Sequence, residues 1–184
     1  IKSTYKDNSF LENSIIQEIE NLQLTDQNYW RIYGLGERGI SETTVYTHWQ
    51  FCDELPDGDT FYGLDFGWNN QTALVKVVEN DKRFYVKELL YESHKTNSDL
   101  IELMKDLVDY NNYIYADCAE PQRIEEISNA GFNILPADKD VDKGIDSIKS
   151  HQLFITKDSV NLLKEIKSYK YKTKDDKVTD DPVK

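Results

Sequence analysis

Residues 61–90 read FYGLDFGWNNQTALVKVVENDKRFYVKELL and contain three runs rich in β-branched and aromatic residues. These runs are Phe61–Phe66, Thr72–Glu79 and Arg83–Leu90. The polar residues between the second and third runs, Asn80, Asp81 and Lys82, suit a tight turn. The pattern predicts three consecutive strands that pair as an antiparallel meander.

Helices and single strands alternate after this meander. Thr96 and Asp99 suit a helix start, and apolar residues recur at helical spacing from Leu100 to Val108. The next elements are a buried strand at Tyr113–Ala116, a helix at Pro121–Ala130 and a fifth strand at Phe132–Leu135. Three meander strands followed by helix, strand, helix and strand are the connectivity of the ribonuclease H-like fold. We therefore expect an α/β domain with a central mixed five-stranded sheet flanked by helices.

Further elements are predicted on both sides of this block. Before it, Ser9 and Glu12 form a capping-box pattern that opens an amphipathic helix over Ser9–Leu24, and Tyr29–Phe51 has the composition of extended segments and turns. After it, the pattern predicts a short helix at Ile145–His151, a strand at Leu153–Thr156, a helix capped by Asp158, and a hairpin that turns at Asp175 and Asp176.

Composition limits the class of protein. A chain of 184 residues with 39% hydrophobic and 12% aromatic content can bury a core, so it is not a disordered tail. It contains neither a long apolar run nor a signal-peptide pattern, so we expect a soluble intracellular protein without a membrane partner. The net charge of −12, taken over the whole chain, argues against nucleic-acid binding. Residues 138–184, however, hold 11 lysines and 10 acidic residues, a composition typical either of a solvated face or of a DNA contact.

Several familiar motifs are excluded. Cys52 and Cys118 share no zinc-ligand spacing with the three histidines, and no histidine is placed to activate Cys118 as a nucleophile. The glycines of Gly34–Gly39 match a dinucleotide fingerprint but lack the strand and helix that it requires. The sequence has no phosphate-binding loop, so we do not expect this chain by itself to bind ATP.

Two aspartates carry the candidate chemistry. Asp65 lies in the first meander strand between Leu64 and Phe66, and Asp117 follows the apolar strand at Tyr113–Ala116. A carboxylate in such a strand is costly to bury without a partner. In the expected fold these two strands are parallel neighbours, so Asp65 and Asp117 meet at their carboxyl ends. Two close carboxylates repel each other unless a divalent cation neutralises them, and Mg²⁺ or Mn²⁺ accepts such oxygen ligands.

The motifs taken together resemble the C-terminal nuclease domain of the large terminase subunit of tailed bacteriophages, with the connector that joins it to the ATPase. Two segments resemble the connector, Thr4–Leu11 and Tyr33–Glu37. Four segments resemble the nuclease: Gly63–Gly67 and Tyr115–Pro121 around the two acids, the basic loop Lys139–Ile145, and the hairpin residues Tyr169–Lys172. The resemblance spans nearly the whole chain in the family's order.

The resemblance implies a metal-dependent endonuclease that cuts concatemeric double-stranded viral DNA during genome packaging. Asp65 and Asp117 would be catalytic and would bind two Mg²⁺ or Mn²⁺ ions for phosphodiester hydrolysis. Lys139, Lys143, Lys170 and Lys172 would contact DNA phosphates. The implied partners are DNA, the ATPase motor domain of the same protein, the small terminase subunit and the portal. The implied location is the cytoplasm of an infected or lysogenic bacterial host.

The resemblance also sets the expected domain division and its gaps. Residues 1–58 would be the connector, and residues 59–184 would be a nuclease domain that is incomplete at its C-terminus. The family's third acidic ligand follows a segment like Asp181–Lys184, so that ligand stays unassigned here. Two alternatives remain open. One is a noncatalytic module that docks on DNA or the portal, and the other is a different ribonuclease H-like nuclease such as a junction resolvase.

Overall fold

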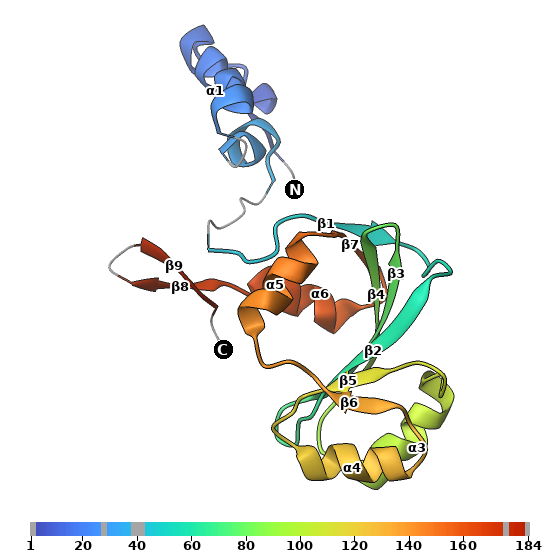
Figure 1. Ribbon diagram of the computed structural model, residues 1–184. Coiled ribbons are helices and arrows are strands. Elements are labelled where there is room, and N and C mark those ends of the chain that lie inside the picture. Colours follow the sequence, from blue (N-terminus) through green and yellow to red (C-terminus); the bar gives the residue numbers. More distant parts are fainter. Residues whose placement is uncertain (1–2, 27–28, 38–42, 175–176, 183–184) are drawn as a thin grey trace. The chain divides into compact units, whose positions relative to one another are not determined.

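The computed structural model describes residues 3–26, 29–37, 43–174 and 177–182 (Figure 1). The chain divides into two compact units, Val45–Tyr169 and a second unit made of Ile1–Thr44 with Lys170–Lys184. The predicted division between connector and nuclease after residue 58 stays a prediction. Within the described residues, no helix combines the length and apolar character that crossing a membrane requires.

A mixed seven-stranded sheet forms the centre of the larger unit, in the order β1-β7-β4-β3-β2-β5-β6 (Figure 1). Its strands are β1 (Trp49–Cys52), β2 (Asp59–Asp65), β3 (Thr72–Asn80), β4 (Arg83–Glu92), β5 (Ile114–Ala116), β6 (Ile134–Pro136) and β7 (Gln152–Thr156). As predicted, β2, β3 and β4 form an antiparallel meander, and β5 and then β6 extend it in parallel beside β2. This α/β arrangement is ribonuclease H-like.

The sheet is larger than the five strands predicted for it. β7 pairs in parallel with β4, and β1 pairs in parallel with β7. Without them β4 would be an edge strand with a row of unpaired backbone groups. The segment Trp49–Cys52, expected among extended segments of the connector, is therefore part of the sheet.

Helices α3 (Asn97–Leu107) and α4 (Pro121–Asn129) cover one face of the sheet (Figure 1). Thr96 caps α3 at the predicted helix start, in a capping box with Asp99, and Gly131 follows α4 at φ +100°, a value that favours glycine. The core under these helices consists of buried side chains from both layers, including Tyr62, Leu64, Leu74, Leu90, Leu100, Met104, Ile114 and Ile127.

Helices α5 (Val141–Lys149) and α6 (Val160–Ser168) pack on the side of β4 and β7. Their apolar cluster includes Leu153, Ile155, Leu163, Phe84, Val86, Ile148 and Ile166. Helix α5 begins four residues before the predicted start, because the Asp140 side chain accepts a hydrogen bond from the Lys143 N–H. The N-cap of α6 is Ser159 rather than the predicted Asp158, whose carboxylate pairs with Lys87 at 3.1 Å.

A β-bulge interrupts β4 at Leu89. Leu74 of β3 pairs with Leu90 and the next residue, Val75, pairs with Glu88, so Leu89 has no partner across the ladder. Glu88 and Tyr91 are three residues apart and would point to opposite faces of a regular strand. Because of the bulge both reach α6: Glu88 accepts from the Leu162 N–H at 2.6 Å, and Tyr91 donates to Glu165 at 2.8 Å.

The smaller unit contains a short 3₁₀ turn, η1 (Tyr5–Asp7), the helix α1 (Asn13–Thr25) and a π-helical turn, η2 (Trp30–Gly34). The predicted capping box at Ser9 and Glu12 is wrong, because α1 begins after Glu12. A capping box instead joins Thr4 and Asp7 at η1. Helical structure at η2, where extended segments were predicted, places the Trp30 ring over Gly34, and a Cβ there would lie 2.1 Å from the ring.

The predicted hairpin is formed by β8 (Tyr171–Lys174) and β9 (Lys177–Pro182), which pair in antiparallel fashion. Its expected turn residues, Asp175 and Asp176, lie outside the described residues, as do Arg38 and Gly39 of the glycine-rich segment. The start of β8 is tied to the chain at Thr43, whose carbonyl accepts a hydrogen bond of 2.7 Å from the Tyr171 N–H.

Candidate active site

Asp65 and Asp117 lie side by side at the carboxyl ends of β2 and β5. Leu64 and Ala116 are paired in the parallel ladder, and each aspartate is the next residue along its strand. The Asp117 N–H donates a hydrogen bond of 3.1 Å to the carbonyl of Leu64, which continues the ladder by one step. The two strand ends therefore meet as the predicted connectivity requires.

The electrostatics of this pair suit a cation. Desolvation raises the pKa of Asp65, and the charges of Asp117 and Glu165 raise it further. Asp117 Oδ1 accepts a hydrogen bond of 3.0 Å from the Ala119 N–H, which helps to fix its side chain. A divalent cation would relieve the repulsion, and carboxylate oxygens are the ligands that Mg²⁺ and Mn²⁺ prefer.

The donor set is incomplete within the part of the chain that the structure describes. No three His, Cys, Asp or Glu side chains there are grouped closely enough to hold a metal ion. Two carboxylates fit a hard cation whose remaining positions are filled by water or by a phosphate. The side chains of residues 173–181 lie outside this description.

Glu165 is a third acidic residue that the sequence reasoning missed. Asp65 pairs with Ala73 of β3, and Ala73 pairs with Tyr91 of β4, so the three residues form one row across the sheet. The Tyr91 hydroxyl donates a hydrogen bond of 2.8 Å to Glu165 on α6. Glu165 also borders a cleft of about 400 Å³ between α5 and α6. No motif marks this residue, because only the packing of α6 on β4 brings its charge toward Asp65.

The loop that follows Asp65 is stabilised by hydrogen bonds to a buried side chain. The buried hydroxyl of Thr72 accepts a hydrogen bond of 3.1 Å from the Gly67 N–H and donates one of 2.8 Å to the Gly67 carbonyl. A Cβ at Gly67 would lie 2.5 Å from the carbonyl oxygen of Gln71, so the turn requires glycine. On the other side, the guanidinium of Arg123 lies over the ring of Phe66 at 4.4 Å.

The four predicted DNA-contacting lysines differ in their surroundings. Lys139 is exposed between β6 and α5, whereas Lys143 lies within α5 and its Nζ is 3.0 Å from Asp140 Oδ2. Lys143 therefore has a local counter-charge. Lys170 and Lys172 are exposed and belong to the smaller unit, at β8. Contact of these lysines with DNA stays a prediction.

Comparisons with known proteins point to one family. The family model described as "Phage terminase large subunit" matches residues 1–37. A curated relative, the PBSX phage terminase large subunit of Bacillus subtilis (strain 168), is 26% identical over 149 residues, which cover 74% of this chain and 34% of the relative. The chain is similar in sequence to the large subunits of phage terminases. It spans about a third of that curated terminase's length.

Solved terminase structures share the fold. The nuclease domain of the large terminase of bacteriophage SPP1, solved with bound Mn, has a TM-score of 0.61 and 17% identity, with 75% of this chain and 86% of that chain covered. A large terminase from a thermophilic bacteriophage has a TM-score of 0.63 and 19% identity, with 98% of this chain and 50% of that chain covered. The seven-stranded unit therefore has the fold of terminase nuclease domains.

Proposed function

We propose that this chain is a divalent-metal-dependent endonuclease that cuts concatemeric double-stranded viral DNA during genome packaging. The observation that carries the proposal is the adjacent placement of Asp65 and Asp117 at the carboxyl ends of β2 and β5. The relationship to terminase large subunits and the fold shared with a nuclease domain that was solved with Mn support it.

In the proposed mechanism, Asp65 and Asp117 would hold two Mg²⁺ or Mn²⁺ ions. A bound divalent ion supplies Lewis acidity at the scissile phosphate. The hydrogen bond to Asp117 from the Ala119 N–H keeps that carboxylate turned in one direction. Glu165 accepts a hydrogen bond from Tyr91 through Oε1, and in this proposal its other carboxylate oxygen orients a water molecule.

DNA would be held by charge. Lys139, Lys143, Lys170 and Lys172 contact backbone phosphates in this proposal, so cutting depends little on base sequence and weakens at high salt. Lys143 contributes less than Lys139, because Asp140 already compensates its charge. We also propose that the chain acts in the host cytoplasm. Its proposed partners are the ATPase motor domain, the small terminase subunit and the portal. The match to the thermophilic phage terminase includes 98% of this chain but only 50% of that chain. This supports the proposal that the full protein contains a further domain.

Cleavage of supercoiled plasmid in Mn²⁺ tests the proposal. We expect wild-type chain to nick or linearise the plasmid, and Asp65→Asn or Asp117→Asn to lower the rate at least about 100-fold. Asp106→Asn, which makes the same change on the exposed face of α3, should leave the rate unchanged. Equal rates for all four proteins would overturn the assignment of Asp65 and Asp117.

A noncatalytic docking module is the second candidate. The incomplete ligand set among the described residues favours it. The same proteins separate the two functions by calorimetric titration with Mn²⁺, because a docking module does not need a cation between these carboxylates. Mn²⁺ binding that is equal in wild type and Asp117→Asn, together with absent cleavage, would favour docking.

A further inference from the structure

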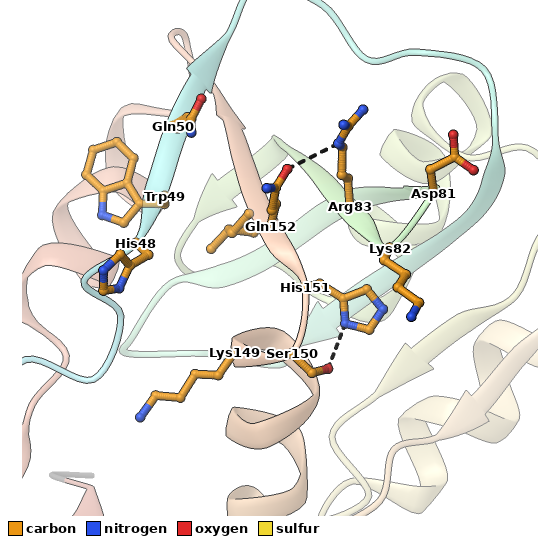
Figure 2. A pocket seen from close by; sticks show the side chains of 11 residues that line it. His48, Trp49, Gln50, Asp81, Lys82, Arg83, Lys149, Ser150, His151 and Gln152 are labelled. Carbon is orange, nitrogen blue, oxygen red and sulfur yellow. Dashed lines mark hydrogen bonds between the residues drawn. The ribbon is translucent and has the colours of Figure 1, made fainter.

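A second concave site lies at the opposite end of the sheet from the carboxylates. Its cavity has a volume of about 680 Å³ and is lined by three segments: the start of β1, the β3–β4 turn and the α5–β7 connection (Figure 2). β2 and β4 run in the same direction, since each is antiparallel to β3. Arg83 begins β4 and Tyr91 lies near its end, so at a rise of about 3.3 Å per residue the pocket is about 25 Å from the row of Asp65.

The pocket is cationic although the whole chain carries a net charge of −12. Lys82 and Arg83 line it at the β3–β4 turn, and Lys149 lines it at the end of α5. Asp81 is the only acidic side chain among the described residues that line it. Across the described parts of the chain, no carboxylate forms an ion pair with Lys82 or Arg83. This surface attracts anions.

Three interactions hold the pocket in shape. Gln152 Oε1 accepts a hydrogen bond of 3.2 Å from Arg83 Nε, which leaves the terminal guanidinium nitrogens for another acceptor (Figure 2). The His151 ring stacks on Phe84 with centroids 4.0 Å apart, and its Nε2 lies 3.5 Å from Glu79 Oε1. The His151 side chain is therefore already partnered, and the binding charge in this pocket comes from Lys82 and Arg83.

Lys82 occupies a backbone conformation that favours glycine. Asp81 and Lys82 have φ values of 49° and 59°, as at the two central positions of a type I′ hairpin turn. A side chain in this left-handed region is strained relative to glycine. Lysine at this position thus places a charge at the pocket mouth at a cost to the fold.

The chemistry favours the phosphates of a polymer over a free nucleotide. The lining that the structure describes contains no glycine, so it offers no glycine-rich loop of amides around a single phosphate cluster. Its cations are instead spread over two segments, with the Trp49 ring and the His48 side chain at a third. Arginine binds phosphate through a planar fork, and a lysine beside it adds a point charge.

We infer that this pocket binds backbone phosphates of DNA and is a second DNA contact, about 25 Å along β4 from the row of the carboxylate pair. The inference rests on the proposed function for its ligand, but the site is separate. DNA that contacts both sites would be bound by the pocket at one end of the sheet and cut at the carboxylate pair at the other end.

The test is binding of a fluorescein-labelled 20-base-pair duplex in EDTA, measured by anisotropy at several salt concentrations. We expect Lys82→Gln/Arg83→Gln to raise Kd at least about tenfold and to reduce the slope of log K against log salt by about 1 to 2. Lys105→Gln on α3 removes one exposed lysine that is paired with Glu102, and it should change Kd less than about twofold. Equal Kd values for the double variant and Lys105→Gln would overturn the inference.

The variant Lys82→Gly separates an effect on DNA binding from an effect on folding. Glycine relieves the turn strain, so Tm should stay the same or rise while Kd for the duplex rises about threefold or more. A fall in affinity that always accompanies a fall in Tm would contradict the inference. A thermal-shift series with ATP in place of DNA tests the alternative ligand. A rise in Tm with ATP but not with the duplex would assign the pocket to free nucleotides and contradict the inference. EDTA prevents cutting, so these results are independent of the Asp65→Asn cleavage test.

Discussion

The hydroxyl of Tyr91 donates a hydrogen bond of 2.8 Å to Glu165, and this bond joins α6 to the row of the sheet that ends at Asp65. The bond also raises the pKa of the Tyr91 hydroxyl, since it is made to an anionic acceptor. Glu165 is therefore held on the side of the sheet where Asp65 carries its charge.

Tyr91→Phe removes this bond and keeps the ring. Hydrogen bonds to charged groups contribute about 1.5 to 3 kcal/mol, and exposure reduces that value here. We expect Mn²⁺-dependent plasmid cleavage to slow roughly threefold to tenfold, equivalent to about 0.7 to 1.4 kcal/mol. The Mn²⁺ affinity should change less than the rate.

A double-mutant cycle tests whether Tyr91 acts through Glu165. Tyr91→Phe combined with Glu165→Gln should be no slower than Glu165→Gln alone, because the partner is already altered. Fully multiplicative effects of the two substitutions would show that Tyr91 and Glu165 act independently.

Thr72→Val should loosen the loop after Asp65. Valine fills the same buried volume but leaves the N–H and carbonyl of Gly67 without their partner, which we expect to cost about 1 to 3 kcal/mol of unfolding free energy in urea. Thr72→Ser keeps the hydroxyl and serves as the control. A Thr72→Val protein as stable as wild type would contradict the role assigned to this hydroxyl.

Glu88→Ala should detach the start of α6 from β4. The carboxylate accepts from the Leu162 N–H at 2.6 Å and from Asn161 Nδ2 at 2.8 Å, so its loss leaves helix-start donors unsatisfied. We expect a loss of about 1 to 3 kcal/mol by urea denaturation. Glu92→Ala on the same strand breaks only an exposed pair with Lys95 and should cost less than about 1 kcal/mol.

Asp99→Asn should show a pH-dependent stability defect. Hydrogen bonds from Thr96 lower the pKa of Asp99 below its ordinary 3.8. Its carboxylate therefore stabilises the fold above that pH, and the contribution is lost as pH falls through the lowered value. The Tm difference between wild type and Asp99→Asn should be present at pH 7 and shrink at about pH 3. Asp106→Asn on the same helix should show no comparable change, and an Asp99→Asn difference that persists at low pH would refute the explanation.

Local patterns were sufficient for the central block of the fold. The meander, the Thr96 cap, Pro121 at the start of α4 and Gly131 after it all depend on neighbours within a few residues, so the sequence predicts them. The meeting of Asp65 and Asp117 follows from the connectivity of the same block.

Long-range packing accounts for what the sequence did not predict. The place of Trp49–Cys52 beside β7 depends on a partner about 100 residues away, and a short aromatic segment carries no sign of that pairing. Glu165 looks like a lone acid in a lysine run until α6 packs on β4. Helix α1 begins later than predicted, because its N-cap is Glu12 rather than Ser9.

The extra residue Leu89 allows Glu88 and Tyr91, which are three residues apart, to contact α6 from the same face of β4. Deleting Leu89 would leave Glu88 and Tyr91 two residues apart, still opposite Val75 and Ala73 on one face of the sheet. Pairing all the present residues of β4 without a bulge would instead turn one of the two side chains to the other face, and either Glu88 or Tyr91 would then lose α6. A strand without the bulge presents two residues to the same helix when they are at positions i and i+2, whereas β4 does so with residues at i and i+3.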